Sequence, residues 1–178
     1  MKYRIASMVV GFLSLLLSPA PLAFAQTPIQ TAPTPAPRLN LSGAAFICAN
    51  QAATGTCPDA EFDPALGAML NAQGTWAANV SLPQGATVTA LRLCGNFNEV
   101  GSSITATLER TPLTAASGLP SEETMATIQS SGASNQTQCF QTTKIKNAGI
   151  NNAKNQYYVV VAVPDNNGVI FTAIQIDY

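Results

Sequence analysis

Histidine is absent from the whole chain, and this absence limits the chemistry that its side chains can perform. It excludes Ser–His–Asp and Cys–His catalysis and the zinc hydrolase sites that use histidine ligands. Glycoside hydrolysis remains available, because it needs only two carboxylates. The acids fall mostly in predicted loops or on predicted solvent faces: Asp59, Glu61, Asp63, Glu99, Glu109, Glu122, Glu123, Asp165 and Asp177. No pattern places two of them across a cleft, so we expect surface acids and no enzyme activity.

Three of these acids alternate along one segment, at Asp59, Glu61 and Asp63. The alternation matches the spacing of oxygen ligands in some calcium-binding loops. The glycine and the distal glutamate of an EF-hand do not follow, so the segment supports only the hypothesis of a structural calcium ion. Solvated surface acids are the alternative interpretation. No other cofactor is indicated.

The cysteines predict two disulfides in an exported chain, with three connectivities to choose from: Cys48, Cys57, Cys94 and Cys139. We favour Cys48–Cys57 together with Cys94–Cys139. Alternation places Leu93 and Phe140 inward, so Cys94 and Cys139 should both lie on the outer face, as a bridge requires. A zinc site built from four cysteines is the alternative, and the lack of a CxxC motif disfavours it.

The N-terminus has the three parts of an export signal. Lys2 and Arg4 precede an uncharged, largely apolar run over residues 5–17, and Ala23-Phe24-Ala25 is a small-x-small cleavage site. The run is shorter than the roughly 20 residues needed to span a bilayer, which disfavours the alternative of a retained anchor. We therefore expect residues 1–25 to be a cleaved signal peptide that directs the protein to a secreted or periplasmic location. No cysteine follows the cleavage site closely, so no lipid or membrane anchor is expected in the mature form.

After cleavage the chain would carry six basic and nine acidic residues, a formal charge of −3. Without a basic patch, nucleic acid and anionic membrane surfaces are not expected partners. Residues 26–38 are rich in proline and predict a semi-extended linker. Residues 39–178 have the length of one domain, and its polar surface must be built mainly from Thr, Ser, Asn and Gln.

The domain reads as about eight short strands separated by turn signals. We expect them at residues 39–48, 76–82, 86–94, 104–110, 125–130, 138–145, 156–163 and 169–178. The residues Gly95-Asn96 read as a turn, and Asn166-Asn167-Gly168 as a hairpin. The pattern predicts an all-β fold, an antiparallel β-sandwich that is jelly-roll-like.

A short helix near residues 64–72 is the exception. Asp63 can cap it, Pro64 suits its first position and Gly74 can stop it, although strand plus loop fits nearly as well. Among the aromatic residues, Trp76, Tyr157 and Tyr158 lie in predicted strands, where core packing is the default. Phe97 falls in a predicted loop and is expected to be exposed.

Several segments together resemble a loose group of secreted bacterial β-sandwich proteins of mostly unknown function: Leu82–Thr89, Met125–Ile128, Ser130–Gly132 and Tyr157–Val161. The resemblance covers about residues 75–178 and rests on strand and turn patterns. It implies a bacterial exported protein and offers no catalytic residues.

The sequence therefore favours an exported, non-catalytic β-sandwich that acts as a binding or assembly module. Its partner would be a polar ligand such as a glycan, another protein or a second copy of itself. A carboxylate-dependent glycan-active enzyme is the first alternative, and a small outer-membrane β-barrel is a weaker one, because aromatic girdles are missing.

Overall fold

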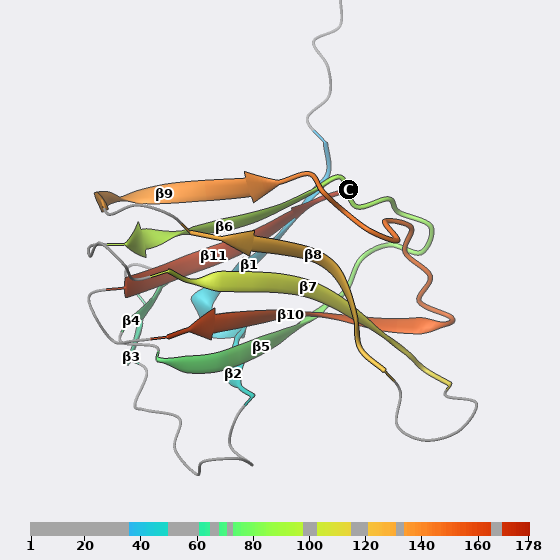
Figure 1. Ribbon diagram of the computed structural model, residues 1–178, viewed down its shortest axis with the longest axis horizontal. Helices are drawn as coiled ribbons and strands as arrows, with labels where there is room; N and C mark the ends of the chain where they lie inside the picture. The colour runs from blue at the N-terminus through green and yellow to red at the C-terminus, as the bar shows by residue number, and fades with distance from the viewer. Residues whose placement is uncertain are drawn as a thin grey trace, which may run out of the picture. The chain divides into compact units, whose positions relative to one another are not determined.

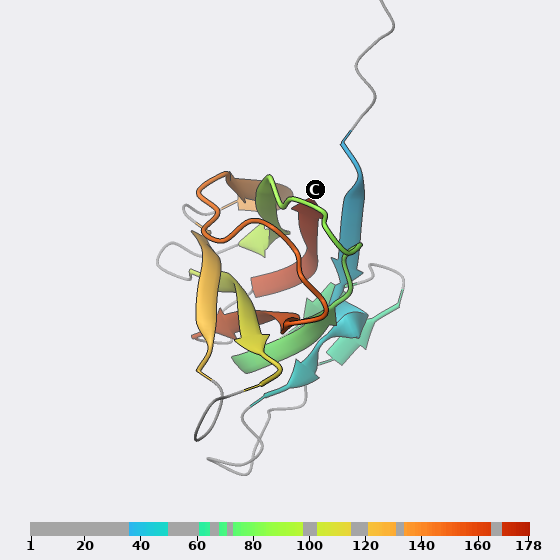
Figure 2. The same cartoon turned by 90° about the vertical axis from the view of Figure 1, so that its right-hand side faces the viewer.

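Two antiparallel β-sheets make up the part of the protein that the computed structural model describes, namely residues 36–49, 61–64, 68–70, 73–97, 103–114, 121–130, 134–164 and 169–178. The first sheet has the order β3 (Glu61–Asp63), β4 (Ala68–Leu70), β11 (Val169–Asp177), β6 (Ala90–Phe97) and β9 (Ser134–Thr142), and β1 (Arg38–Ser42) also pairs with β11. The second has the order β2 (Ile47–Cys48), β5 (Gly74–Val80), β10 (Asn155–Val163), β7 (Thr105–Pro112) and β8 (Glu123–Gln129). Figures 1 and 2 show them as two layers.

The strand order is that of a jelly roll. β1 and β4 pair with successive halves of β11, so together they occupy one strand position. Counting them as the first of eight strands and β5 as the second, one sheet runs 1-8-3-6 and the other 2-7-4-5. This is the double Greek key of a jelly roll, and it confirms the predicted all-β antiparallel sandwich of about eight strands.

The core lies between the two sheets and follows the period of two that strands impose. Leu91 and Leu93 of β6, Val159 and Val161 of β10 and Leu108 of β7 are fully buried. β10 has neighbours on both sides, as its two apolar faces predicted. No helix in the described ranges is long and apolar enough to cross a membrane.

The first predicted strand is in fact two strands in different sheets. β1 lies in the first sheet and β2 in the second, and a 3₁₀ turn over Gly43–Ala45 carries the chain between them. Leu41 and Phe46 on either side of this turn are buried, and the Phe46 ring meets Phe171 edge-on at 5.0 Å. Residues 39–48 therefore contribute to one core from two sheets, through Leu41 and Phe46.

The helix considered for residues 64–72 is wrong where the structure describes that segment. Ala68–Leu70 forms β4, whose Met69 and Leu70 pair with Phe171 and Ile170 of β11. Backbone pairing on this half of β11 outweighs the weak local preference that Asp63 and Pro64 give to a helix. Residues 65–67 and 71–72, like the expected hairpin at 166–168, lie outside the described residues.

The expected turn at Gly95-Asn96 lies inside β6 instead. Glycine is needed there for space and not for a turn, because a Cβ on Gly95 would lie 2.5 Å from the Ile170 carbonyl oxygen. The strand continues to Phe97, which is fully buried and contacts Phe140 edge-on at 5.5 Å. The expected exposure of Phe97 is therefore also wrong.

β11 contains a bulge that the sequence pattern does not reveal. Strict alternation would place Phe171 and Ile174 on opposite faces, yet both are buried. The register with β6 shifts between Phe171 and Ala173, which turns Phe171 back toward the core. Ile174 and Ile176 are also buried, and the C-terminal strand lies in the middle of the first sheet.

Candidate functional site

The outer face of the second sheet presents polar side chains in rows that cross the strands. One row consists of Asn79, Tyr158, Glu109 and Thr124, and the next of Ile47, Ala77, Val160, Thr107 and Thr127. We call this surface the Tyr158 face, after the aromatic residue in its first row. Its nine residues are three threonines, one asparagine, one tyrosine, one glutamate and three apolar residues.

Tyr158 is half-buried, and its hydroxyl group lies among polar neighbours. The Thr111 hydroxyl donates a hydrogen bond of 3.3 Å to it. Burial raises the pKa of the Tyr158 hydroxyl, and the neighbouring carboxylates of Glu122 and Glu109 raise it further, while the Thr111 bond opposes them. The phenol therefore stays protonated at neutral pH.

A hollow of about 380 Å³ lies beside this tyrosine. Its lining residues are Ala45, Ile47, Ala77, Ala78, Asn79 and Tyr158. The small alanines leave space between the Tyr158 ring and Ile47, a side chain that is 72% exposed. An exposed isoleucine beside a half-buried tyrosine gives the hollow apolar walls, and Asn79 adds an amide at its rim.

The Tyr158 face is acidic. The Glu109 carboxylate accepts a hydrogen bond of 2.9 Å from the Thr107 hydroxyl, and Glu122 is exposed. Within the described ranges neither carboxylate forms a salt bridge, whereas Glu123 is held by Arg110 at 2.6 Å. The face therefore combines an aromatic ring, an amide and two carboxylates without a compensating cation.

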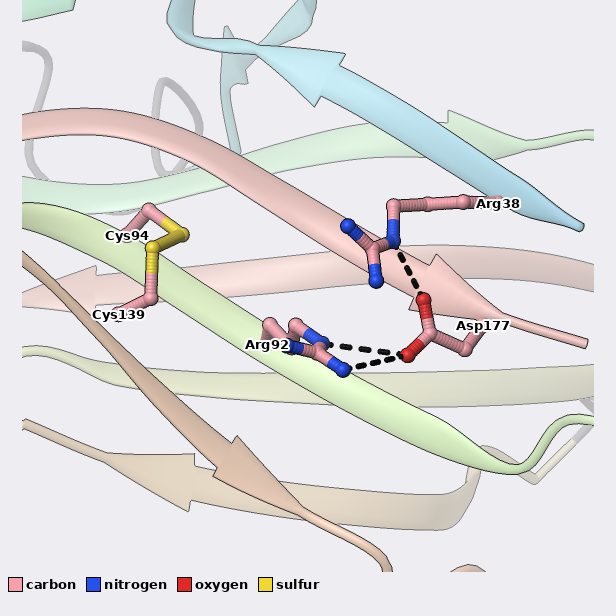
Figure 3. The surroundings of a disulfide bond; sticks show 5 residues. All are labelled: Arg38, Arg92, Cys94, Cys139 and Asp177. Atoms are coloured by element: carbon pink, nitrogen blue, oxygen red, sulfur yellow. Dashed lines mark hydrogen bonds and ion pairs between the residues drawn. A yellow bond between two sulfur atoms is a disulfide. The ribbon is translucent and has the colours of Figure 1, made fainter. Parts of the chain in front are cut away.

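The first sheet contains the confirmed disulfide. Cys94 and Cys139 are directly opposite on β6 and β9, bonded with their Cα atoms 4.1 Å apart (Figure 3). Cys48 is also disulfide-bonded. The partner predicted for it, Cys57, lies outside the described residues.

Beside this disulfide, Asp177 forms a two-arginine cluster (Figure 3). Its carboxylate accepts a hydrogen bond from Arg38 at 2.6 Å and two from Arg92 at 2.9 and 3.1 Å. These bonds hold the pKa of the Asp177 carboxyl below its ordinary value, with Arg38 contributing most and burial opposing. All three groups are engaged with one another, so the cluster stabilises the sheet and offers little to a ligand.

The calcium hypothesis stays a prediction. Asp59 and the side chain of Glu61 lie outside the described part, and Asp63 is half-buried in β3. In the described part of the chain no three Cys, Asp or Glu side chains come together as a metal site would require.

Of the aromatic residues, Trp76 and Tyr157 are in the core as expected, but Tyr158 is on the outer face. The signal was available in the sequence. Tyr157 and Tyr158 are adjacent in one strand, and adjacent side chains point to opposite faces. Only one of them can belong to the core of a two-layer sandwich.

No family model matches the chain, and no curated protein is similar to it in sequence. Solved structures with some likeness include a xylan-binding domain from carbohydrate-binding module family 22, which is 16% identical with a TM-score of 0.35, over 62% of this chain and 71% of that one. The family 22 and glycoside hydrolase family 10 modules of Clostridium thermocellum xylanase 10B, complexed with xylohexaose, are 14% identical with a TM-score of 0.37.

That second likeness covers 79% of this chain and only 25% of the other. The C-terminal family 22 module of the same xylanase is 15% identical with a TM-score of 0.34, over 79% of this chain and 81% of that one. All three TM-scores lie below 0.5, so they carry no argument about function. The β-sandwich fold implied by the resemblance to secreted bacterial proteins is present, and export itself stays a prediction.

Proposed function

We propose that this protein is a non-catalytic binding module that takes a glycan on the Tyr158 face. The observation that supports the proposal is the hollow of about 380 Å³, where Tyr158 lies beside the Asn79 amide and the exposed Ile47. Sugars present apolar C–H faces and equatorial hydroxyls, so they suit a surface that offers an aromatic ring and amide groups together.

The charges of the Tyr158 face limit the classes of sugar that it would bind. Glu109 and Glu122 accept hydrogen bonds from sugar hydroxyls but repel acidic sugars, because no cation compensates them in the described part of the protein. The Tyr158 face is therefore proposed to prefer neutral or amino sugars. Protein partners of the assembly type remain a weaker alternative, since the apolar residues of this face are interspersed with Thr, Asn and Glu side chains and form no large apolar centre.

Catalysis is the second candidate, because Glu109 and Glu122 flank one hydroxyl group and glycosidases use two carboxylates. Against it, both carboxylates stand on an open sheet face and Glu122 is exposed, so water is not excluded from the space around them as it is in a closed active site. The proposal also includes a secreted or periplasmic location, for which the Cys94–Cys139 disulfide is the supporting feature.

The test is calorimetric titration of the protein with neutral and amino-sugar oligosaccharides. Tyr158→Ala is expected to weaken binding about tenfold, equivalent to about 1.4 kcal/mol, because the ring contact is lost. Gln129→Ala, at the exposed outer edge of the same sheet, is the matched control and should bind like the native protein. Absence of binding to every such glycan, or equal effects of the two variants, would reject the proposal. If the protein turned over a glycan and Glu122→Gln abolished that turnover, the enzyme would replace the binding module as the proposed function.

A further inference from the structure

A second and larger hollow lies at one end of β7 and β10, on the side of these strands opposite to the Tyr158 face. It measures about 550 Å³ and is lined by Arg110, Pro112, Thr114, Gly149, Asn151, Lys154 and Asn155. Arg110 and Pro112 alternate along β7 with Glu109 and Thr111, which belong to the neighbourhood of Tyr158. The two hollows are therefore separate. We call the second one the Lys154 pocket, and its volume falls within the range of about 300–1,000 Å³ usual for ligand sites.

Backbone hydrogen bonds hold the rim of the Lys154 pocket in place. Ile150 exchanges bonds with the 83–88 segment, donating to the Ala86 carbonyl at 2.8 Å and accepting from Gly85 at 3.0 Å. The Lys154 carbonyl accepts from the Leu113 amide at 2.8 Å, which ties the segment to the end of β7. A segment fixed at both ends presents its side chains without an ordering cost for the backbone on binding.

Asn151 is positioned from inside the core. Its backbone amide donates a bond of 2.7 Å to the hydroxyl of Tyr157, a side chain that is fully buried. Its side-chain oxygen Oδ1 is itself buried and has no hydrogen-bond partner among the described residues. Such orphaned acceptors are rare in folded proteins and are costly to leave unpaired. Because Asn151 lines the pocket, a rotation of its side chain on binding would bring Oδ1 to a ligand hydroxyl, and the hydrogen bond would remove that cost.

The charge around this pocket is opposite to that of the Tyr158 face. Every lysine beyond the N-terminal Lys2 belongs to the segment that connects β9 to β10, residues 143–154: Lys144, Lys146 and Lys154. No acid occurs between residues 143 and 164, and none of these lysines forms a salt bridge in the described part of the protein. Arg110 adds a guanidinium group at the wall, where Glu123 neutralises part of its charge at 2.6 Å. Lys154 is thus an uncompensated cation at a pocket that also holds an unused acceptor.

We propose that the Lys154 pocket binds a sugar unit that carries a carboxylate, a uronate. The Lys154 ammonium would pair with the carboxylate, with the Arg110 guanidinium beside it. The Asn151 Oδ1 atom would accept a hydrogen bond from a ring hydroxyl, and this demand separates a uronate from a simple anion. The site goes beyond the Tyr158 face, because it selects for the class of sugar that the acidic face repels.

The experiment is calorimetric titration of the full chain with uronate oligosaccharides and with neutral oligosaccharides of equal length. Lys154→Gln is expected to weaken uronate binding about tenfold. Lys144→Gln removes the same charge from the same segment without lining the pocket, and it should change the affinity less than about twofold. Equal losses in the two variants would show that only net charge matters and would overturn the site.

Asn151→Ala separates binding from folding. It deletes an acceptor that forms no hydrogen bond among the described residues, so the melting temperature should not fall, whereas uronate affinity should. Tyr158→Ala must leave uronate binding unchanged, which keeps this result independent of the proposed glycan function. Inorganic phosphate binding as tightly as the uronate, or neutral and acidic oligosaccharides binding equally, would overturn the assignment.

Discussion

The Asp177 cluster gives the sharpest test of the structure, through the change Asp177→Asn. The Asp177 side chain is 8% exposed, while those of Arg38 and Arg92 are 38% and 29% exposed. The substitution keeps the shape of the side chain and removes its charge. Two guanidinium groups then face each other across the first sheet with a neutral amide between them.

The size of the effect follows from the three hydrogen bonds that Asp177 accepts. Removing one partner of a fully buried ion pair costs about 3–5 kcal/mol. Here the arginines are partly exposed and recover some hydration, so we expect the free energy of unfolding to fall by about 3 kcal/mol. For a domain of this size that corresponds to a drop of about 10 °C in melting temperature.

The same cluster predicts a pH dependence with a definite sign. The two arginines hold the pKa of folded Asp177 below its ordinary value of 3.8. The carboxylate therefore stabilises the fold fully above the unfolded pKa, and this contribution is lost as the pH falls through the lower, folded pKa. The stability gap between native protein and Asp177→Asn should be constant near neutral pH and should narrow below about pH 4.

Urea unfolding monitored by circular dichroism between pH 2.5 and 7 measures both quantities. Glu123→Gln is the matched control, because Glu123 pairs with Arg110 but is 44% exposed. It should cost only about 0.5–1 kcal/mol. If Asp177→Asn costs no more than this control, or if its stability gap does not change with pH, the cluster does not stabilise the sheet as argued.

Three further changes test other parts of the fold by thermal or urea unfolding. Gly95→Ala should destabilise by about 2 kcal/mol or more, because the new methyl group meets the Ile170 carbonyl oxygen, and wild-type stability would contradict the close approach. Replacing both Cys94 and Cys139 by alanine opens a link with a sequence separation of 45 and should cost about 4 kcal/mol, and an unchanged melting temperature under oxidising conditions would contradict the bridge. Deleting residues 174–178 should prevent folding, since they pair with β1 and β6, and a cooperatively melting truncation would show otherwise.

The sequence predicted the architecture well wherever alternation was clean. Ile104–Arg110, which alternates, and Gln156–Val163, which is apolar on both faces, were placed in the right strands, and the outward Cys94 and Cys139 followed from Leu93 and Phe140 pointing inward. Alternation works there because a sandwich core imposes a period of two on every strand that crosses it. The same physics gave the direction of both thiols without any knowledge of which strands pair.

The errors occur where pairing with a distant strand overrides a local signal. Gly95 reads as a turn residue, yet it lies within β6 because β11 approaches too closely for a side chain. Asp63 and Pro64 favour a helix just before Ala68–Leu70, but this segment pairs with β11 instead. Phe171 is buried through a bulge that no pattern announces. β11 takes part in each case: it is the distant strand for Gly95 and for Ala68–Leu70, and its own register shift against β6 buries Phe171.

The two candidate surfaces depend on the register of a single strand. Tyr157 points inward, where its hydroxyl accepts from the Asn151 amide at 2.7 Å, and Tyr158 points outward beside Asn79. A slip of one residue in β10 would exchange them, because side chains alternate between faces. That slip would bury the ring of the Tyr158 face and also release the segment that forms the Lys154 pocket. The Tyr157–Asn151 bond therefore links core packing to both surfaces, and it explains why neither surface can be inferred from composition alone.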